Sequence, residues 1–243
     1  MPATTLLLSL LASNAMAATV ELPRYPAASP DGTSVVFSWR GDLWRSPAAG
    51  GEAVRLTTNP GDDLRSIFTR DGTTLVFESS REGARNIWAM PAAGGEPRQL
   101  TFGDSPVLLG GLGTGADGKP VVMVDSSREG DLYRAMRPYQ VSLEGGPLAR
   151  VHDAFGTRPT ANANGVVLFE RGGNSWLRRG YHGPDARDVW CFTPGKPPEQ
   201  AFQRLTSWMG NDGQGQWLGN DAYLYLSDRD GAVNLYRKAL KDA

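Results

Sequence analysis

Short apolar runs recur along the chain, and each one follows a turn sequence that contains Gly. Gly beside Asp or Asn supplies the positive φ of a tight turn, and a short unbroken apolar run is typical of a strand buried on both faces. The pattern therefore predicts five hairpins, each with a buried second strand. The turn and run pairs are Asp31-Gly32 with Val35-Val36-Phe37, Asp71-Gly72 with Leu75-Val76-Phe77, Asp117-Gly118 with Val121-Val122-Met123-Val124, Asn164-Gly165 with Val166-Val167-Leu168-Phe169, and Gly219-Asn220-Asp221 with Tyr223-Leu224-Tyr225-Leu226.

A second set of features keeps the same phase. The sequence Pro47-Ala48-Ala49-Gly50-Gly51-Glu52 occurs again, letter for letter, at residues 91–96. An aromatic residue precedes each Gly pair, and an Arg-Leu-Thr type triplet follows it. A fixed order of features at this spacing is the signature of a structural repeat. The aromatic residues are Trp44, Trp88, Tyr139, Trp190 and Tyr236, and the aliphatic residues of the triplets are Leu56, Leu100, Val151 and Leu205.

Each repeat is predicted to be a four-stranded meander. An inner strand precedes the turn, a second strand follows it, a third carries the aromatic residue and a fourth carries the triplet. Meanders of this size bury their faces by packing radially, so the sequence predicts an all-β fold, a β-propeller of about five blades over residues 18–243. We expect the repeated aromatic residues to pack between blades.

The fifth repeat ends at Ala243, before its fourth strand. Two arrangements remain open. Residues 18–22 could supply the missing strand and close a ring of five blades, or further blades could follow Ala243. The predicted propeller is in that sense incomplete.

Composition excludes several classes of partner. The chain has 25 Lys and Arg against 26 Asp and Glu, with a formal net charge of −1. No electrostatic footprint for nucleic acid or an anionic membrane is present. Cys191 is the only cysteine, so no internal disulfide can form, and we expect it to be a packed strand residue.

The N-terminus is predicted to be a secretory signal over residues 1–17. An apolar run at residues 6–12 is too short to span a bilayer, and the small-residue site Ala15-Met16-Ala17 follows it. Cleavage is expected after Ala17, which predicts a periplasmic or secreted protein.

The chain offers no candidate catalytic residue, cofactor site or metal ligand set. The Gly-x-Ser-x-Gly elbow of serine hydrolases is missing, and Pro106 removes the amide N–H that would follow Ser105. His152 and His182 are the only histidines, and neither has a second ligand at metal spacing. We expect His152 to be a hydrogen-bonded or exposed strand residue.

The hairpin between the second and third strands varies in length from repeat to repeat. Such variation at one fixed place indicates loops that project from one face, often the face that meets a partner. Its longest copy, residues 171–187, is a candidate partner-contact loop, although the same side chains also suit a loop that folds back on its own blade. Its candidate contact residues are Trp176, Arg178, Arg179, Tyr181 and His182.

The repeats also resemble those of a known family. The similarity lies in residues 25–32, 39–44 and 50–57, and continues through Ser79-Ser80-Arg81-Glu82-Gly83, Ser126-Ser127-Arg128 and residues 139–146 and 176–190. These segments resemble the N-terminal TolB-like β-propeller region of tricorn-type serine proteases, of the C-terminal-processing peptidase group. The resemblance implies a longer layout with a second propeller, a PDZ-like module and a catalytic domain. Nothing in the chain matches those later parts, so no catalytic residue is carried over and we expect no peptidase activity from this chain alone.

Two functions are consistent with these observations. The first is the non-catalytic propeller domain of an exported tricorn-like serine peptidase, which gates or docks peptide or unfolded protein substrates. The alternative is a stand-alone periplasmic TolB-like scaffold that binds a protein partner. Neither requires a cofactor, nucleic acid or a membrane after signal cleavage. A propeller glycosidase or lactonase would need convergent carboxylates or a metal on the inner strands, and the sequence shows neither.

Overall fold

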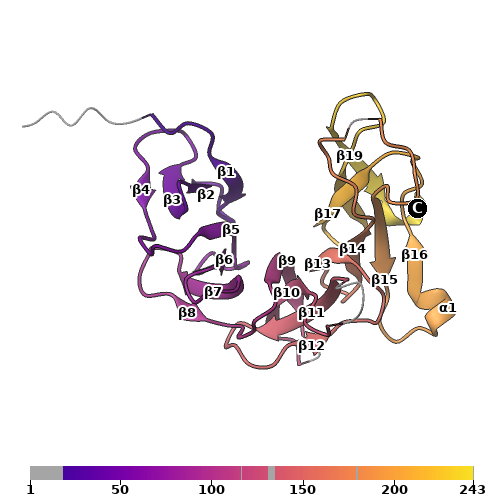
Figure 1. Cartoon of the computed structure of the whole chain (residues 1–243), viewed down its shortest axis with the longest axis horizontal. Coiled ribbons are helices and arrows are strands. Elements are labelled where there is room, and N and C mark those ends of the chain that lie inside the picture. The colour runs from indigo at the N-terminus through magenta and orange to yellow at the C-terminus, as the bar shows by residue number, and fades with distance from the viewer. Residues whose placement is uncertain (1–18, 116, 131–134, 179, 243) are drawn as a thin grey trace, which may run out of the picture.

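The structure is a computed structural model that describes residues 19–115, 117–130, 135–178 and 180–242. The predicted signal at residues 1–17 and the candidate contact residue Arg179 lie outside the described residues. Five antiparallel sheets follow one another along the chain and form an open arc, with the first and last sheets at its two ends (Figure 1). The all-β, propeller-type fold is thereby confirmed.

Each of the first three blades is a meander of four strands in sequence order. Their strands are β1 (Arg24–Ala28), β2 (Ser34–Trp39), β3 (Asp42–Pro47) and β4 (Val54–Arg55) in blade 1; β5 (Asp63–Phe68), β6 (Thr74–Ser79), β7 (Asn86–Pro91) and β8 (Arg98–Gln99) in blade 2; and β9 (Val107–Thr114), β10 (Pro120–Ser126), β11 (Arg137–Ser142) and β12 (Ala149–Arg150) in blade 3.

Blade 4 keeps the plan, and blade 5 has three strands in the described part of the chain. Residues 19–22 form no strand, so the arrangement in which they complete blade 5 is not found. They run as irregular chain into β1, on the opposite end of the arc. The remaining elements are β13 (Thr157–Ala161), β14 (Val167–Arg171), β15 (Asp188–Phe192), α1 (Pro198–Ala201), β16 (Phe202–Arg204), β17 (Asp212–Leu218), β18 (Ala222–Ser227), β19 (Asn234–Ala239) and the 3-10 turn η1 (Leu240–Asp242).

The hydrophobic core lies between neighbouring blades. Between blades 1 and 2, for example, Val36 and Leu43 pack with Phe77 and Trp88. Three further clusters of the same kind join blade 2 to 3, blade 3 to 4, and blade 4 to 5. Because the second strand of each blade lies inside the sheet and contributes side chains to both neighbouring interfaces, it needs an unbroken apolar run.

The turns differ from the prediction in length. The connection from β1 to β2 has five residues, 29–33, where Asp31 accepts hydrogen bonds from the Ser29 hydroxyl and the Thr33 N–H. Gly32 has a φ of 71°, as the turn sequence requires. Asp71 makes the same bonds in blade 2. These Asp residues therefore stabilise the loop, and the positive φ is confined to Gly.

The repeated aromatic residues have a second partner besides the core. Trp88 and Tyr139 are buried between blades, whereas Trp44, Trp190 and Tyr236 are half-buried. An Arg guanidinium lies over each of the five rings, at distances between 4.5 and 6.0 Å. The Arg residues are Arg55, Arg81, Arg128, Arg171 and Arg229. Arg171 ends the second strand of its blade, whereas Arg81, Arg128 and Arg229 each stand two residues beyond a second strand that ends in Ser, which explains why Ser-x-Arg sequences recur in the repeats.

Candidate functional site

One cavity of about 490 Å³ is lined by all five inner strands. Ala27 of β1, Ile67 of β5, Gly111 of β9, Thr160 of β13 and Gln216 of β17 each contribute to its wall. Because successive blades bring their first strands to the same centre, this cavity is part of the central channel of the arc.

Every inner strand is irregular at the same level of this channel. A register shift interrupts its pairing with the second strand. In four of the strands a residue other than Gly takes a positive φ there: Tyr25 (52°), Arg65 (49°), Arg158 (53°) and Gln214 (54°). Positive φ is uncommon in residues other than Gly, and β-bulges re-aim side chains. The repetition shows that the bulges are part of the blade design.

In blades 2 to 5, a buried side chain of the preceding blade holds the bulge of the inner strand. It sits on the second strand, directly after the apolar run, and accepts a backbone N–H from the next inner strand. We call these contacts the interblade clasps. They are Ser38 Oγ to the Arg65 N–H at 3.3 Å, Glu78 Oε1 to the Leu109 N–H at 2.8 Å, Asp125 Oδ2 to the Arg158 N–H at 3.4 Å, and Glu170 Oε2 to the Gln214 N–H at 2.9 Å.

The clasp carboxylates are almost completely buried. Glu78, Asp125 and Glu170 have exposed fractions of 0, 2 and 1 %. Arg85 pairs with Glu78 at 3.3 Å, and Arg187 pairs with Glu170. The sequence analysis missed this set, although the signal was present as a charged residue immediately after three of the apolar runs.

Burial is the largest influence on the pKa of two clasp carboxylates, Glu78 and Asp125. It raises the pKa of Glu78, with the Leu109 N–H and nearby Arg residues acting in the opposite direction. It raises the pKa of Asp125 to about 7, because no ion pair within the described residues offsets the loss of hydration. Asp125 is therefore partly protonated near neutral pH.

Asp125→Asn is expected to stabilise the protein at pH 8 by on the order of 2 kcal/mol and to change its stability little at pH 4. The pKa of Asp125 is raised in the folded state, so the folded chain retains a proton that the unfolded chain has lost. The stabilisation that the protonated Asp125 contributes to the folded state is therefore fully present below about pH 4, and it is lost as the pH rises through 7. Urea unfolding of both proteins at the two pH values measures the difference, and the titration of groups that do not interact with Asp125 cancels. A variant less stable than the wild type at pH 8 would contradict the assignment.

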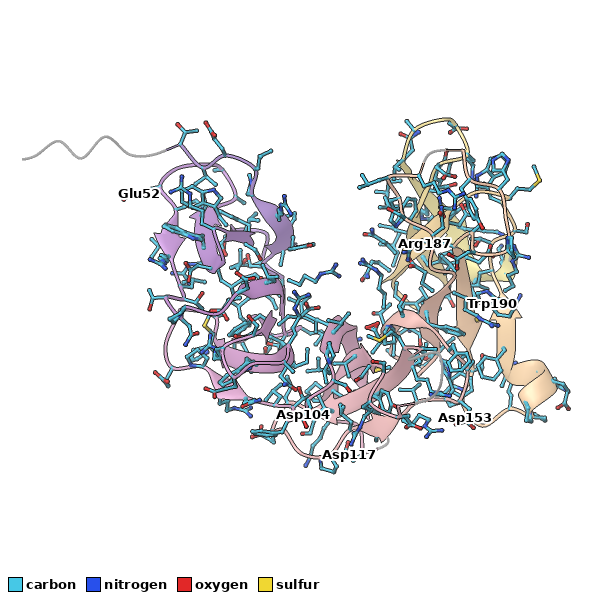
Figure 2. The ribbon with its side chains drawn as sticks, in the orientation of Figure 1. Glu52, Asp104, Asp117, Asp153, Arg187 and Trp190 are labelled. Atoms are coloured by element: carbon cyan, nitrogen blue, oxygen red, sulfur yellow. The ribbon has the colours of Figure 1, made fainter. Side chains whose placement is uncertain are left out.

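The candidate contact loop folds back on blades 4 and 5. Asn174 Nδ2 donates to Asn211 Oδ1 at 3.0 Å, and Asp185 Oδ1 accepts the Gly173 N–H at 2.7 Å. Arg187, at the end of the loop, lies well above Trp190 on the limb formed by blades 4 and 5 (Figure 2). The loop is thus held in place on the surface by these hydrogen bonds.

Its aromatic residues divide into two groups. Trp176 and His182 line a groove of about 780 Å³ together with Trp208 and Val233 of the adjoining loops. The ring centroids of His182 and Trp208 lie 5.6 Å apart. Trp176 also packs on the inner strand β17, since a Cβ added to Gly213 would lie 3.1 Å from its Cζ2 atom. This contact places Trp176, one wall of the groove, beside an inner strand.

The other two described contact residues lie outside the lining of that groove. The Arg178 guanidinium stacks on the Tyr181 ring at 4.3 Å, and Arg178 is exposed. The loop therefore makes contacts to its own blades, one of the two roles considered from the sequence, and its role in contacting a partner stays a prediction.

His152 corrects an expectation. It is 6 % exposed, and neither ring nitrogen has a hydrogen-bond partner among the residues that the structure describes. Instead the ring packs against Phe169, Phe192 and Phe202 of blade 4, with centroids 4.5 to 5.2 Å away. Burial lowers its pKa to about 4, so the imidazole is neutral at pH 7.

Comparison with the other blades explains why the ring nitrogens of His152 have no hydrogen-bond partner. At the same place blades 1, 2 and 4 carry Thr, whose hydroxyl accepts an N–H from the third strand and donates to an Asp or Asn at its start. These pairs are Thr57 with Asp42, Thr101 with Asn86, and Thr206 with Asp188. Blade 3 has Arg137 where the acceptor would be, so the imidazole turns to the interface with blade 4.

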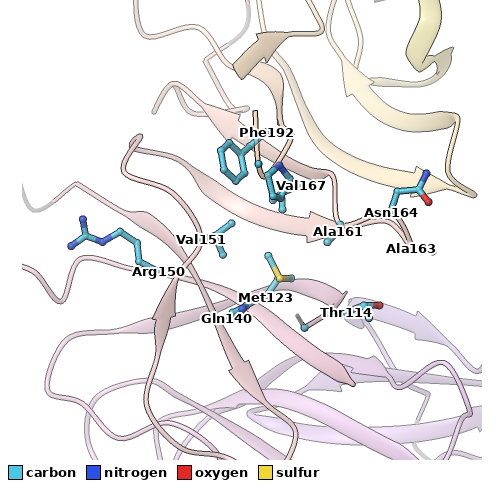
Figure 3. A pocket seen from close by; sticks show the side chains of 14 residues that line it. Thr114, Met123, Gln140, Arg150, Val151, Ala161, Ala163, Asn164, Val167 and Phe192 are labelled. Carbon is cyan, nitrogen blue, oxygen red and sulfur yellow. The ribbon is translucent and has the colours of Figure 1, made fainter. Parts of the chain in front are cut away.

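Beside this interface, a groove of about 460 Å³ opens between blades 3 and 4. In Figure 3, Met123 and Val151 from blade 3 approach Val167 and Phe192 from blade 4. Val151 occupies the position where the other blades carry Leu, and the smaller side chain leaves part of the interface unfilled.

Other candidate chemistry finds no support in the described part of the chain. No three His, Cys, Asp or Glu residues gather there as a metal site requires. Cys191 is buried in β15, and burial raises the pKa of its thiol. Ser105 lies in the connection between β8 and β9. None of the helices among the described residues has the length and apolar character needed to cross a membrane.

Three comparisons place the chain among known proteins. Tricorn protease homolog 1 of Streptomyces coelicolor is 28% identical over 216 residues, which cover 88% of this chain and 19% of that protein. The crystal structure of the tricorn protease superposes with a TM-score of 0.75 at 16% identity, over 93% of this chain and 22% of that one. A putative TolB from Agrobacterium tumefaciens gives a TM-score of 0.69 at 18% identity, over 93% and 79%.

The chain thus spans about a fifth of the length of the two tricorn relatives. The family model described as the tricorn protease N-terminal beta propeller domain matches residues 20–243, nearly the whole chain. The chain belongs to the family of tricorn protease N-terminal β-propeller domains.

Proposed function

We propose that this propeller is the non-catalytic, substrate-admitting domain of an exported tricorn-like serine peptidase. Unfolded protein or peptide docks at the channel, and folded protein is kept out. The observation that carries the proposal is the cavity to which all five inner strands contribute. In this proposal peptide-bond hydrolysis belongs to the remainder of a longer peptidase, since the tricorn relatives are about five times as long as this chain.

The dimensions of the channel suit this role. A cavity of about 490 Å³ holds a few residues of extended chain, and it is far too small for a folded domain. Selection is then steric and needs no sequence-specific contact. Bulges and clasps keep the wall rigid, because the inner strands β5, β9, β13 and β17 are each hydrogen-bonded to the blade before them.

The groove beside Trp176 gives the substrate a first contact. Its lining combines Trp176, Trp208 and Val233 with the imidazole of His182. Aromatic rings provide large contact areas at small cost in side-chain entropy, and they accept many different side chains. We infer that an extended peptide lies along this groove before it enters the channel.

Trp176→Ala is expected to weaken binding of a fluorescein-labelled unstructured peptide to residues 18–243 by about tenfold. The indole supplies a wall of the groove, so its loss removes contact area from the groove. Fluorescence anisotropy measures the dissociation constant. The matched control is Phe102→Ala, which removes a ring that is 74 % exposed in blade 2. Equal affinities for wild type and Trp176→Ala would contradict docking at this groove.

A stand-alone periplasmic scaffold that binds a folded protein is the second candidate. It is favoured by the likeness to a putative TolB, of which this chain covers 79%. The same titration separates the two functions. A chain that does not bind unstructured peptides but binds a folded protein partner is a scaffold.

Export is part of the proposal. It is supported by the apolar run and the Ala15-Met16-Ala17 site. The mass of the chain recovered from the periplasmic fraction tests it, since cleavage after Ala17 leaves Ala18 as the first residue.

A further inference from the structure

The groove beside Trp176 has a mainly apolar lining. Leu177, in the long loop of blade 4, is 93 % exposed, and Val233, in the hairpin between β18 and β19, is 46 % exposed. Trp176 and Trp208 add two indole rings to the same lining. Exposed apolar side chains that gather at one place, unlike single ones, mark an interaction site. The groove is therefore a candidate binding site for apolar side chains.

Neither indole N–H in the lining is available to a ligand. Trp208 Nε1 donates to Asp228 Oδ1 at 2.9 Å. Trp176 Nε1 is buried without a hydrogen-bond partner among the described residues, and the ring of Trp176 packs against Gly213 of β17. Both rings therefore offer apolar surface to whatever lies in the groove.

Two charged side chains complete the described lining, and both are already occupied. Asp228 accepts three hydrogen bonds, from the Trp208 indole and from the backbone and side chain of Asn211, each at 2.9 Å. Burial acts to raise the pKa of Asp228, but these donors outweigh it and hold that pKa below its ordinary value. Arg229 donates to both carboxylate oxygens of Asp212 at 3.0 Å. The described lining thus offers a ligand no unpaired charge.

This distribution of charge decides which side chains the groove accepts. A Glu or Lys side chain would lose its hydration there without gaining an ionic partner, which costs free energy. A Leu or Phe side chain gains free energy in proportion to the apolar area that it removes from water. The exposed His182 is the remaining polar side chain, and its ring lies edge-on to Trp208, with centroids 5.6 Å apart, so it adds ring surface.

Hydrogen bonds hold the two walls of the groove in place before a ligand arrives. Asn211, which is fully buried, links the loop of blade 4 to the hairpin of blade 5. Its side-chain oxygen accepts from Asn174 Nδ2 at 3.0 Å and from the Arg187 N–H at 3.3 Å, and its side-chain nitrogen donates to Asp228 Oδ2 at 2.9 Å. A preformed site loses less conformational entropy when it binds a ligand. The walls are therefore built for binding.

We propose that this groove selects unfolded protein by its chemistry, because it binds large apolar side chains, such as those of Leu and Phe, from an extended segment. This inference rests on the proposed function and names the class of segment that docks. Large aliphatic and aromatic side chains are mostly buried in folded proteins, whereas an unfolded chain exposes them. Admission is then selective at two places, by apolar contact at the groove and by size at the channel.

Four unstructured Gly/Ser-rich peptides, each with an N-terminal fluorescein and an amidated C-terminus, are titrated against residues 18–243 by fluorescence anisotropy. Each peptide carries one pair of identical residues, Leu, Gln, Glu or Lys, at positions i and i+2, because these two side chains lie on one side of an extended chain. We expect the Leu peptide to bind about tenfold more tightly than the Gln peptide. The Glu and Lys peptides are expected to bind no more tightly than the Gln peptide.

The preference for Leu is expected to disappear in Leu177→Asn/Val233→Asn. The matched control is Leu22→Asn/Leu218→Asn, which changes side chains of similar exposure, 82 and 46 %, outside the lining of the groove, and it retains the preference. Thermal unfolding shows that each variant is folded, and Leu177→Asn alone serves if the double variant is not. Three results overturn the proposal: equal affinities of the wild type for the Leu and Gln peptides, tighter binding of the Glu or Lys peptide, or a preference for Leu that persists in Leu177→Asn/Val233→Asn.

Competition distinguishes an unfolded substrate from a folded partner. Unlabelled lysozyme is added to the complex with the Leu peptide, either in its native form or reduced and carboxamidomethylated. Both forms carry the same charged side chains, so they differ in the exposure of their apolar side chains. We expect the unfolded form to displace the peptide and the native form to leave it bound. Equal displacement by the native form would identify a docking surface for folded protein and would overturn the proposal.

The neutral apolar dye N-phenyl-1-naphthylamine separates this inference from the proposed function. If none of the four peptides binds, the proposed function fails. An increase in dye fluorescence that occurs with the wild type and is lost with Leu177→Asn/Val233→Asn then still supports an apolar binding site in the groove. The absence of that increase, together with the absence of peptide binding, rejects both.

Discussion

Glu170→Ala is expected to lower the free energy of unfolding by about 3–5 kcal/mol, the range for removing one partner of a buried ion pair. The Glu170 side chain is 1 % exposed and pairs with Arg187, which is itself only 17 % exposed. Its other oxygen accepts the Gln214 N–H of blade 5 at 2.9 Å. The substitution therefore leaves a buried guanidinium without its counter-charge and an inner-strand N–H without an acceptor.

Urea unfolding at pH 7 measures this loss. Glu144→Ala is the matched control, because Glu144 lies 3.9 Å from Arg98 with 90 % of its side chain exposed. Exposed ion pairs contribute about 0 to 1 kcal/mol, so the control is expected to unfold almost as the wild type does. Glu170→Gln tests the two contributions separately, since the amide oxygen can still accept the Gln214 N–H. Similar small losses for Glu170→Ala and Glu144→Ala would show that the clasp does not join blades 4 and 5.

Phe77→Ala is expected to lower the free energy of unfolding by about 3–5 kcal/mol for a different reason. Phe77 lies on β6, is completely buried and packs between blades 1 and 2 with Val36 and Leu43. Its cross-strand neighbour is Trp88. Removing the ring leaves a cavity between two sheets. Because each sheet is held in shape by its own hydrogen bonds, the sheets cannot move together to fill the cavity.

Phe102→Ala is the control for this variant as well, because its ring is 74 % exposed and its loss creates no cavity. Differential scanning calorimetry of wild type and both variants provides the comparison. A melting temperature of Phe77→Ala within the range of the control would mean that the interface between blades 1 and 2 contributes little to the stability of the arc.

The repeat made the blades predictable from the sequence. Trp44 and Trp88 stand at the same distance before their Gly pairs, so the third strand could be placed without any structural information. The pairing of Phe37 with Trp44 and of Phe77 with Trp88 follows the predicted order of second and third strands. The period of the repeat carries this information because every blade packs the same faces against its neighbours and therefore needs the same kinds of residue at the same positions.

The candidate site was predictable only in part. Trp176 and His182 were selected because basic and aromatic residues gather in the longest loop, and both line one groove. Tyr181 and Arg178 were selected for the same reason, yet they contact each other. Composition of a loop does not determine which side chains turn toward a neighbouring blade.

His152 was misjudged for a related reason. A sequence shows that blade 3 lacks the Thr of the other blades, but it does not show what surrounds the replacement. Phe169, Phe192 and Phe202 come from three different strands of the next blade, and only their packing turns the position into an apolar pocket.

By itself, the sequence determined the class of fold, the number of repeats in the chain, the order of strands within each blade and the resemblance to tricorn-type propellers. These properties depend on local patterns of turns and apolar runs. Tertiary structure alone decided the interblade clasps. Glu78 meets Leu109, and Glu170 meets Gln214, only after neighbouring blades have packed side by side. These partners belong to different blades, and no local pattern in the sequence encodes which residues of neighbouring blades meet.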